Sequence, residues 1–327
     1  MSPNWQKAEA IPSAFCCIKA LFSMTILITG AQGFVGSHLI KALSKNKVYT
    51  LTQKKNSNAN SVFCDLTQAK QVRDAIKKIK PDLVYHLAAQ SSVPYSWEHP
   101  AETFKVNVLG TLHLLEALKA NKKKCTFLAV ESGEIYGKGE SLTEESALSP
   151  QNPYAASKAA EDIALFPYLK DPFLKIVRAR PFNHIGPGQD TRFAVSHFAY
   201  QIAAIEAKKI PSKIHVGNLK PKRDFTDVRD VVRAYQLLAK KGGAGEAYNI
   251  CSEKLVSIEW ILKKLLSFCS EKIEIKIDPQ FCRKNDILWI AASAKKLRQT
   301  TGWSPQIPLE QSLKDTLNFF RKELKKK

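Results

Sequence analysis

Three polar side chains near the middle of the chain have the types and spacing needed for proton transfer to a reacting oxygen. Tyr154 and Lys158 lie four residues apart and Pro153 suits a first helical turn, so the pattern predicts a helix with both side chains on one face. A free phenol titrates at about pH 10, and a nearby ammonium favours the phenolate. Ser132 follows a predicted buried strand, where its hydroxyl could bind the same oxygen. Each residue type is common in structural roles, whereas the three together indicate an acid–base site.

A glycine-rich segment near the start of the chain indicates what this site would act with. Thr25 to Thr29 is a short β-branched run typical of a buried parallel strand, and a helical pattern begins at Ser37. Between them stand Gly30, Gly33 and Gly36. A strand, a glycine turn and a helix N-terminus together form a cradle for a pyrophosphate, so we expect a dinucleotide there. The spacing is GxxGxxG rather than GxGxxG, and glycines also mark ordinary turns.

The end of the second predicted strand bears on which dinucleotide is used. Residues 47–52 form that strand, and the next residues are Gln53, Lys54 and Lys55. An NAD site commonly has a carboxylate here for the ribose 2′-hydroxyl, and this chain has none. NADP is therefore slightly favoured over NAD, although the two lysines are equally typical of a solvated loop.

Alternating strands and helices over residues 24–182 predict an α/β fold with a doubly wound parallel sheet. The domains expected are an N-terminal extension at 1–23, a dinucleotide-binding domain at 24–186, and a smaller α/β substrate lobe at 187–327 with some interleaved segments. Met24 stands where the fold would begin, so residues 1–23 are expected to be either a dispensable extension or a mis-assigned start. His86 is expected to pack at a strand end, and Asn107 to brace the backbone rather than react.

Composition narrows the functional classes. The chain has 327 residues with a net charge of +20, and 44% of its residues are hydrophobic. No apolar run is long enough for a membrane span, and the basic residues form no aromatic-interleaved stripe typical of nucleic-acid binding. The seven cysteines show no CxxC spacing, which indicates reduced thiols in a cytoplasmic protein without a metal site. The positive charge suits an anionic substrate such as a diphosphate.

From residue 24 to about residue 318, the chain resembles the extended short-chain dehydrogenase/reductases. The resemblance is carried by TGAQGFVG, Ser132 and the YAASK segment that begins at Tyr154. Within that superfamily, HLAAQSSVPYSW, RPFNHIGPGQ and GNLKPKRDFTDVRDVVRAY most resemble the GDP-6-deoxy-D-mannose reductases. GDP-mannose 4,6-dehydratases share several of these positions but differ in the first glycine turn and after His184.

The resemblance implies a Rossmann-type fold and a specific reaction. A hydride from NAD(P)H would reach C4 of GDP-4-keto-6-deoxymannose and yield GDP-D-rhamnose. Tyr154 would protonate the oxygen, Lys158 would tune Tyr154, and Ser132 would orient the ketone. The implied cofactor-binding residues are Gly30, Gly33, Phe34, Val35, Gly36, Lys54, Asp65, Leu66, Leu87, Ala88, Ala89, Tyr154, Lys158 and Pro181. The implied substrate-binding residues are Ser91, Ser132, Asn183, Gln189, Arg223 and Arg283. Relatives commonly pair through helices like those at 103–120 and 154–166, so a homodimer is expected.

Two residues depart from this reading. Glu134 occupies the place of the carboxylate with which dehydratases remove the C5 proton, so it is included among the candidate catalytic residues. The family usually has Ser-Ser or Thr-Ser before that Glu, whereas here Gly133 stands between Ser132 and Glu134. The alternatives are therefore a dehydratase or C4 epimerase on the same fold, or a dinucleotide-binding module without catalysis.

Overall fold

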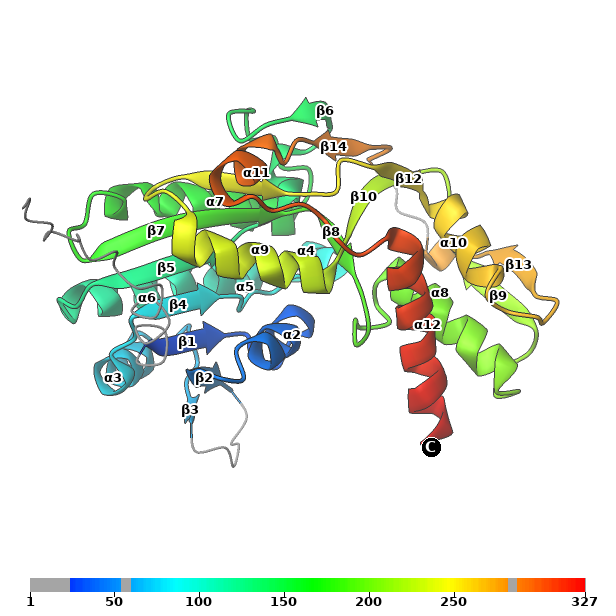
Figure 1. The fold of residues 1–327 in the computed structure, drawn as a ribbon, viewed down its shortest axis with the longest axis horizontal. Coiled ribbons are helices and arrows are strands. Elements are labelled where there is room, and N and C mark those ends of the chain that lie inside the picture. Colours follow the sequence, from blue (N-terminus) through cyan, green and yellow to red (C-terminus); the bar gives the residue numbers. More distant parts are fainter. Residues whose placement is uncertain (1–23, 54–59, 282–286, 327) are drawn as a thin grey trace, which may run out of the picture.

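The structure is a computed structural model that describes residues 24–53, 60–281 and 287–326. Its central feature is a seven-stranded sheet with the order β11-β7-β5-β4-β1-β2-β3 (Figure 1), in which all neighbouring strands are parallel. The strands are β1 (Thr25–Thr29), β2 (Lys47–Thr52), β3 (Ser61–Phe63), β4 (Leu83–His86), β5 (Cys125–Val130), β7 (Leu174–Pro181) and β11 (Ala247–Ile250). The chain winds outward from β1 in both directions, so the predicted doubly wound sheet is confirmed, with its switch point between β1 and β4.

Helices pack over both faces of this sheet because each buries one apolar stripe. In α3 (Ala69–Ile79), Val72, Ile76 and Ile79 are buried while the lysines between them are exposed. α3 packs against α6 (Gly110–Ala120) in one core cluster. α2 (Phe34–Ala42) and α9 (Val228–Lys241) contact each other in the cluster on the other side.

The helix expected at 103–120 is interrupted. α5 (Pro100–Phe104) is followed by a π-helical turn (Lys105–Leu109) and then by α6. A π turn adds one residue to the helical repeat and often marks a functional site. This turn carries Asn107, whose side chain accepts from Gln90 N at 2.8 Å and donates to Gln90 O and Ser157 Oγ. The predicted role of Asn107 as a backbone brace is confirmed.

A second lobe is built on its own core, seen at one end of the molecule in Figure 1. Its helices are α8 (Ala194–Glu206), α10 (Ile258–Leu266) and α12 (Leu309–Lys325), next to the paired strands β9 (Lys213–Val216) and β13 (Glu274–Ile277). The strands β8 (Asn183–Ile185), β10 (Lys222–Asp227) and β12 (Leu255–Ser257) form a small mixed sheet. The expected domain boundary at residue 186 remains a prediction, since β11, from the later part of the chain, completes the central sheet.

Several short elements were not predicted. They include α4 (Val93–Glu98), α11 (Lys295–Thr301), and the parallel pair β6 (Gly139–Leu142) and β14 (Ile290–Ala292). Within the described ranges, no helix is both long and apolar enough to cross a membrane, and no cluster of metal-ligand side chains occurs.

Candidate active site

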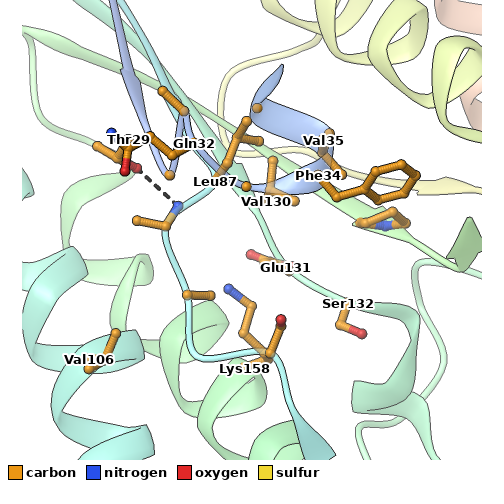
Figure 2. A pocket seen from close by; sticks show the side chains of 18 of the residues that line it. Thr29, Gln32, Phe34, Val35, Leu87, Val106, Val130, Glu131, Ser132 and Lys158 are labelled. Atoms are coloured by element: carbon orange, nitrogen blue, oxygen red, sulfur yellow. Dashed lines mark hydrogen bonds between the residues drawn. The ribbon is translucent and has the colours of Figure 1, made fainter. Parts of the chain in front are cut away.

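A cavity of about 810 Å³ lies at the carboxyl ends of β1, β3, β4, β5 and β7, beside the switch point. Open parallel sheets bind their ligands at this place. In Figure 2, Ser132 and Lys158 come from different elements and border the same space as Leu87 and Val130. The predicted site residues that line it are Gly30, Gly33, Phe34, Val35, Gly36, Asp65, Leu66, Leu87, Ala88, Ala89, Ser91, Ser132, Glu134, Tyr154, Lys158, Pro181, Asn183 and Gln189.

The glycine turn at one end of the cavity requires glycine for steric reasons. Gly30 has φ +68°, and a Cβ built on it would lie 2.7 Å from Ala88 N. A Cβ on Gly36 would lie 2.3 Å from the carbonyl oxygen of Gly30. The turn is therefore packed closely against both β4 and the first turn of α2, which begins at Phe34. This leaves backbone N–H groups at a helix N-terminus, the arrangement that fits a pyrophosphate.

At the other end of the cavity, the structure brings Tyr154 and Ser132 together. Both side chains line the cavity, and the Ser132 hydroxyl is near enough to the Tyr154 phenol to lower its pKa. Tyr154 stands in the first turn of α7 (Pro153–Ala164), which Asn152 caps by accepting from Ala155 N at 2.8 Å. The Tyr154 amide donates to Ser96 Oγ at 3.1 Å. These contacts fix the backbone of Tyr154 at the start of α7.

The charges around Tyr154 differ from those expected. Desolvation raises the pKa of Tyr154, the negative charge of Glu134 raises it further, and the Ser132 hydroxyl lowers it. The protein's own groups thus hold this pKa above its ordinary value, and the expected lowering by Lys158 stays a prediction for the complex with oxidised cofactor. Lys158 itself is buried and paired with Glu161.

Glu134 lines the same cavity and is fixed by a neighbour. Asn152 Nδ2 donates to Glu134 Oε2 at 3.0 Å, and the Glu134 amide donates to Ser132 Oγ at 3.2 Å. The carboxylate therefore stands beside the acid–base pair, where its charge acts on Tyr154. Its inclusion among the candidate catalytic residues remains a prediction.

A buried network of charges lies directly behind this end of the cavity. Arg180 donates to Glu131 at 3.1 Å and to Asp162 at 2.8 Å, and Arg178 donates to Asp162 at 2.8 Å. Desolvation by burial raises the pKa of Glu131 well above its usual range, and the charge of Asp162 adds to that effect. Because Glu131 precedes Ser132 at the end of β5, the network fixes the strand end that carries the serine hydroxyl.

Three predicted residues are not part of the described cavity. Arg223 lies half-buried on β10 beside Val256 and is not among the described lining residues. Lys54 and Arg283 lie outside the described residues, as does the extension at 1–23. Their predicted roles are therefore neither supported nor opposed by the geometry.

Sequence reasoning missed several residues that the fold places at the site. Tyr235 on α9 is fully buried and lines the cavity, and its hydroxyl has no hydrogen-bond partner among the described residues. Arg192 and Phe193 line the cavity just before α8. Tyr235 lies at helical spacing among apolar residues, a pattern that only indicates a core position.

The strand order, the glycine turn at the switch point, and the tyrosine and lysine of α7 next to Ser132 define the class as a short-chain dehydrogenase/reductase. The model of the family described as GDP-mannose 4,6 dehydratase matches residues 27–316. The chain belongs to this family.

Two curated relatives and one solved structure illustrate the similarity. The chain is 37% identical to the GDP-6-deoxy-D-mannose reductase of Pseudomonas aeruginosa, over 90% of this chain and 96% of that protein. It is 32% identical to the GDP-6-deoxy-D-talose 4-dehydrogenase of Aggregatibacter actinomycetemcomitans, over 85% of this chain and 92% of that protein. The solved structure of RMD from Pseudomonas aeruginosa complexed with NADPH matches with a TM-score of 0.82 at 34% identity, and covers 92% of this chain and 100% of that one.

Proposed function

We propose that this protein is a nucleotide-sugar reductase that uses NADPH or NADH to reduce the C4 ketone of GDP-4-keto-6-deoxy-D-mannose to GDP-D-rhamnose. The observation that carries the proposal is that Ser132, Tyr154 and Lys158 line one cavity whose other end is a glycine turn. The similarity to a GDP-6-deoxy-D-mannose reductase over nearly the whole chain supports the substrate, and the NADPH complex of a similar structure supports the cofactor.

The chain's own residues account for binding and proton transfer. Gly30 and Gly36 leave the space in which backbone approaches a pyrophosphate, and Asp65 and Leu66 line the cavity after β3, where an adenosine would lie. When bound, a reduced nicotinamide supplies the hydride. Ser132 hydrogen-bonds the ketone oxygen, and Tyr154 donates its phenolic proton to that oxygen as charge develops on it. A raised pKa keeps Tyr154 protonated before reaction, as an acid requires.

The sugar diphosphate would occupy the side of the cavity nearest the second lobe. Asn183 and Gln189 line the cavity between β7 and α8, and Ser91 lines it after β4. Arg192 is exposed at the rim, where it pairs with Asp190, and a guanidinium is suited to a phosphate. Arg223 and Arg283 remain proposed partners of the phosphates.

A dehydratase is the second candidate, and one observation favours it. Glu134 lines the cavity beside Tyr154, where a base for the C5 proton would be needed. Such an enzyme, like a C4 epimerase, regenerates its nucleotide in every cycle. A reductase consumes it.

Consumption of NADPH therefore tests the proposal. Purified protein mixed with NADPH should oxidise it in proportion to added GDP-4-keto-6-deoxymannose, and should leave GDP-mannose unchanged. Turnover of either sugar without net loss of NADPH would reject the reductase in favour of the second candidate.

We further propose that the protein works in the cytoplasm as a homodimer. Cys64, Cys125 and Cys251 are free thiols, which suits a reducing compartment. Large apolar side chains are exposed along α4, α5, the π turn and the end of α7: Trp97, Phe104, Leu109, Ile163 and Phe166. An apolar surface of this kind is typical of a subunit interface.

A further inference from the structure

Glu161 is a buried carboxylate that no step described so far uses. It lies one helical turn after Lys158 on α7, and both side chains are almost completely buried. One carboxylate oxygen accepts from Lys158 Nζ and the other accepts from Thr111 Oγ1 at 3.2 Å. A buried charge is costly unless it is paired and hydrogen-bonded, and these contacts meet both conditions.

The contacts of Glu161 continue as a chain toward the glycine turn. Thr111 Oγ1 lies 2.7 Å from His86 Nε2, and His86 Nδ1 lies 2.7 Å from Thr29 Oγ1. Thr29 Oγ1 in turn accepts from Ala88 N at 3.1 Å, the bond drawn in Figure 2. Burial lowers the pKa of His86 to about 3, so the imidazole is neutral and joins the two hydroxyls. The chain thus connects Lys158 with Thr29, which precedes Gly30, and with Ala88, against which Gly30 packs.

We propose that Glu161 is a positioning residue for the reaction: it fixes the ammonium of Lys158 in the cavity wall, and its negative charge limits how strongly that ammonium favours the ionised form of Tyr154. Only the predicted change in kcat and kcat/KM depends on the proposed reduction. The pairing with Lys158 and the effect on Tyr154 apply to any use of this cavity.

The direction of the effect follows from the groups that face the phenol. Glu134 faces Tyr154 from the 3₁₀ turn at Gly133–Tyr136, Tyr235 faces it from α9, and Ser132 donates or accepts at the end of β5. Glu161 also raises the pKa of Tyr154.

The groups that face Glu161 itself are Lys158, Asp162 and Thr111, with His86 beyond. Replacing Glu161 by a neutral residue of the same shape removes one negative charge and leaves Lys158 unpaired. Both changes stabilise the phenolate, so the titration of Tyr154 should move to lower pH.

The test compares Glu161→Gln with the parent protein in the binary complex with NADP⁺, without sugar. The tyrosinate absorbance is titrated, with Tyr154→Phe as the background. We expect the titration of Tyr154 to shift to lower pH in Glu161→Gln. Glu161→Asp keeps the negative charge, so its Tyr154 should titrate close to the pH seen in the parent. The exposed carboxylate of Glu116, which binds Tyr168, provides the control variant Glu116→Gln: measured against its own Tyr154→Phe background, its Tyr154 titration should match that of the parent.

A kinetic arm uses GDP-4-keto-6-deoxymannose. The alkaline limb of kcat/KM should move in the same direction, and kcat should fall about tenfold or more, because a displaced lysine misorients the reacting groups. An unchanged or upward-shifted Tyr154 titration would overturn the proposal even if activity fell. If the Tyr154 titration shifts but GDP-4-keto-6-deoxymannose is not reduced by any of these proteins, the proposed substrate is wrong and the proposed role of Glu161 is retained. If Glu161→Gln does not fold, the double variant Lys158→Met with Glu161→Gln is compared with Lys158→Met alone, and Tyr154 should titrate at lower pH in the double variant because Glu161 raises its pKa.

Discussion

The ring of Phe182 occupies the space that a side chain at Gly133 would need: a Cβ built on Gly133 would lie 2.7 Å from Phe182 Cε2. Phe182 stacks on Tyr136 with ring centroids 6.3 Å apart and lines the cavity. The glycine between Ser132 and Glu134 is therefore explained by packing. A serine or threonine at this position would displace the aromatic ring from the cavity wall.

This contact predicts a loss of stability in Gly133→Ala. The added methyl overpacks a buried position, and such changes cost about 1–3 kcal/mol in the free energy of unfolding. Urea unfolding at neutral pH measures it. In the double variant with Phe182→Leu, the smaller side chain should restore part of the loss. Equal stability of Gly133→Ala and the parent would contradict the packing described.

Removal of the Tyr154 hydroxyl should abolish most of the activity but not the fold. We expect Tyr154→Phe to lower kcat for ketone reduction by about 10²- to 10⁴-fold, the usual contribution of a general acid. NADPH binding, followed by fluorescence, should remain. Tyr168, which donates its hydroxyl to Glu116 outside the cavity, gives the control Tyr168→Phe with parental activity. A Tyr154→Phe enzyme with nearly full activity would remove the phenol from the mechanism.

The parts of the site that the sequence could predict are those set by local spacing. The glycine turn and the tyrosine–lysine helix need only a few consecutive residues, and they converge because parallel strands end at one edge of the sheet. Glu161 and Tyr235 could not be found in this way. The importance of Glu161 depends on its burial beside Thr111 and His86, which are distant in sequence, and that of Tyr235 depends on the cavity that it lines.

In the fold, too, the elements with local sequence patterns could be predicted and those that depend on distant contacts could not. The long apolar strands and the helix at 309–325 were predicted correctly because their patterns are strong over many residues. β6 and β14 are four and three residues long and pair across 150 positions of sequence, so no local pattern indicates them. The π turn at Lys105–Leu109 carries Asn107, whose side chain forms hydrogen bonds with Gln90 and Ser157. These partners are distant in sequence, so no local pattern indicates the turn.

The free energy of unfolding should decrease as the pH falls, because His86 is buried in its neutral form. Its pKa is about 3 in the folded protein, against about 6.5 when unfolded, so the unfolded state binds a proton more readily. This contribution is fully present above about pH 6.5 and is lost as the pH falls toward 3, at about 1.4 kcal/mol per pH unit. Urea unfolding at several pH values should show a shallower dependence in His86→Gln than in the parent. The exposed His99→Gln should keep the parental dependence. Identical slopes in all three proteins would contradict burial of a neutral His86.

The apolar surface near the end of α7 predicts the association state. Ile163 is 60% exposed on α7, and Ile163→Glu would place a charge in the proposed interface. Sedimentation should show a dimer for the parent and a monomer for this variant. Ile277 on β13 is 65% exposed, so Ile277→Glu is a matched control that should remain dimeric. A parent that sediments as a monomer would refute the homodimer.

The sugar formed from GDP-4-keto-6-deoxymannose and NADPH, identified by NMR, tests the reductase most directly. The proposed function predicts GDP-D-rhamnose, with one NADPH oxidised for each molecule formed. Formation of the C4 epimer, GDP-6-deoxy-D-talose, would keep the reduction and change its stereochemistry. Recovery of unreduced ketone with all NADPH intact would contradict a reductase at the Tyr154 site.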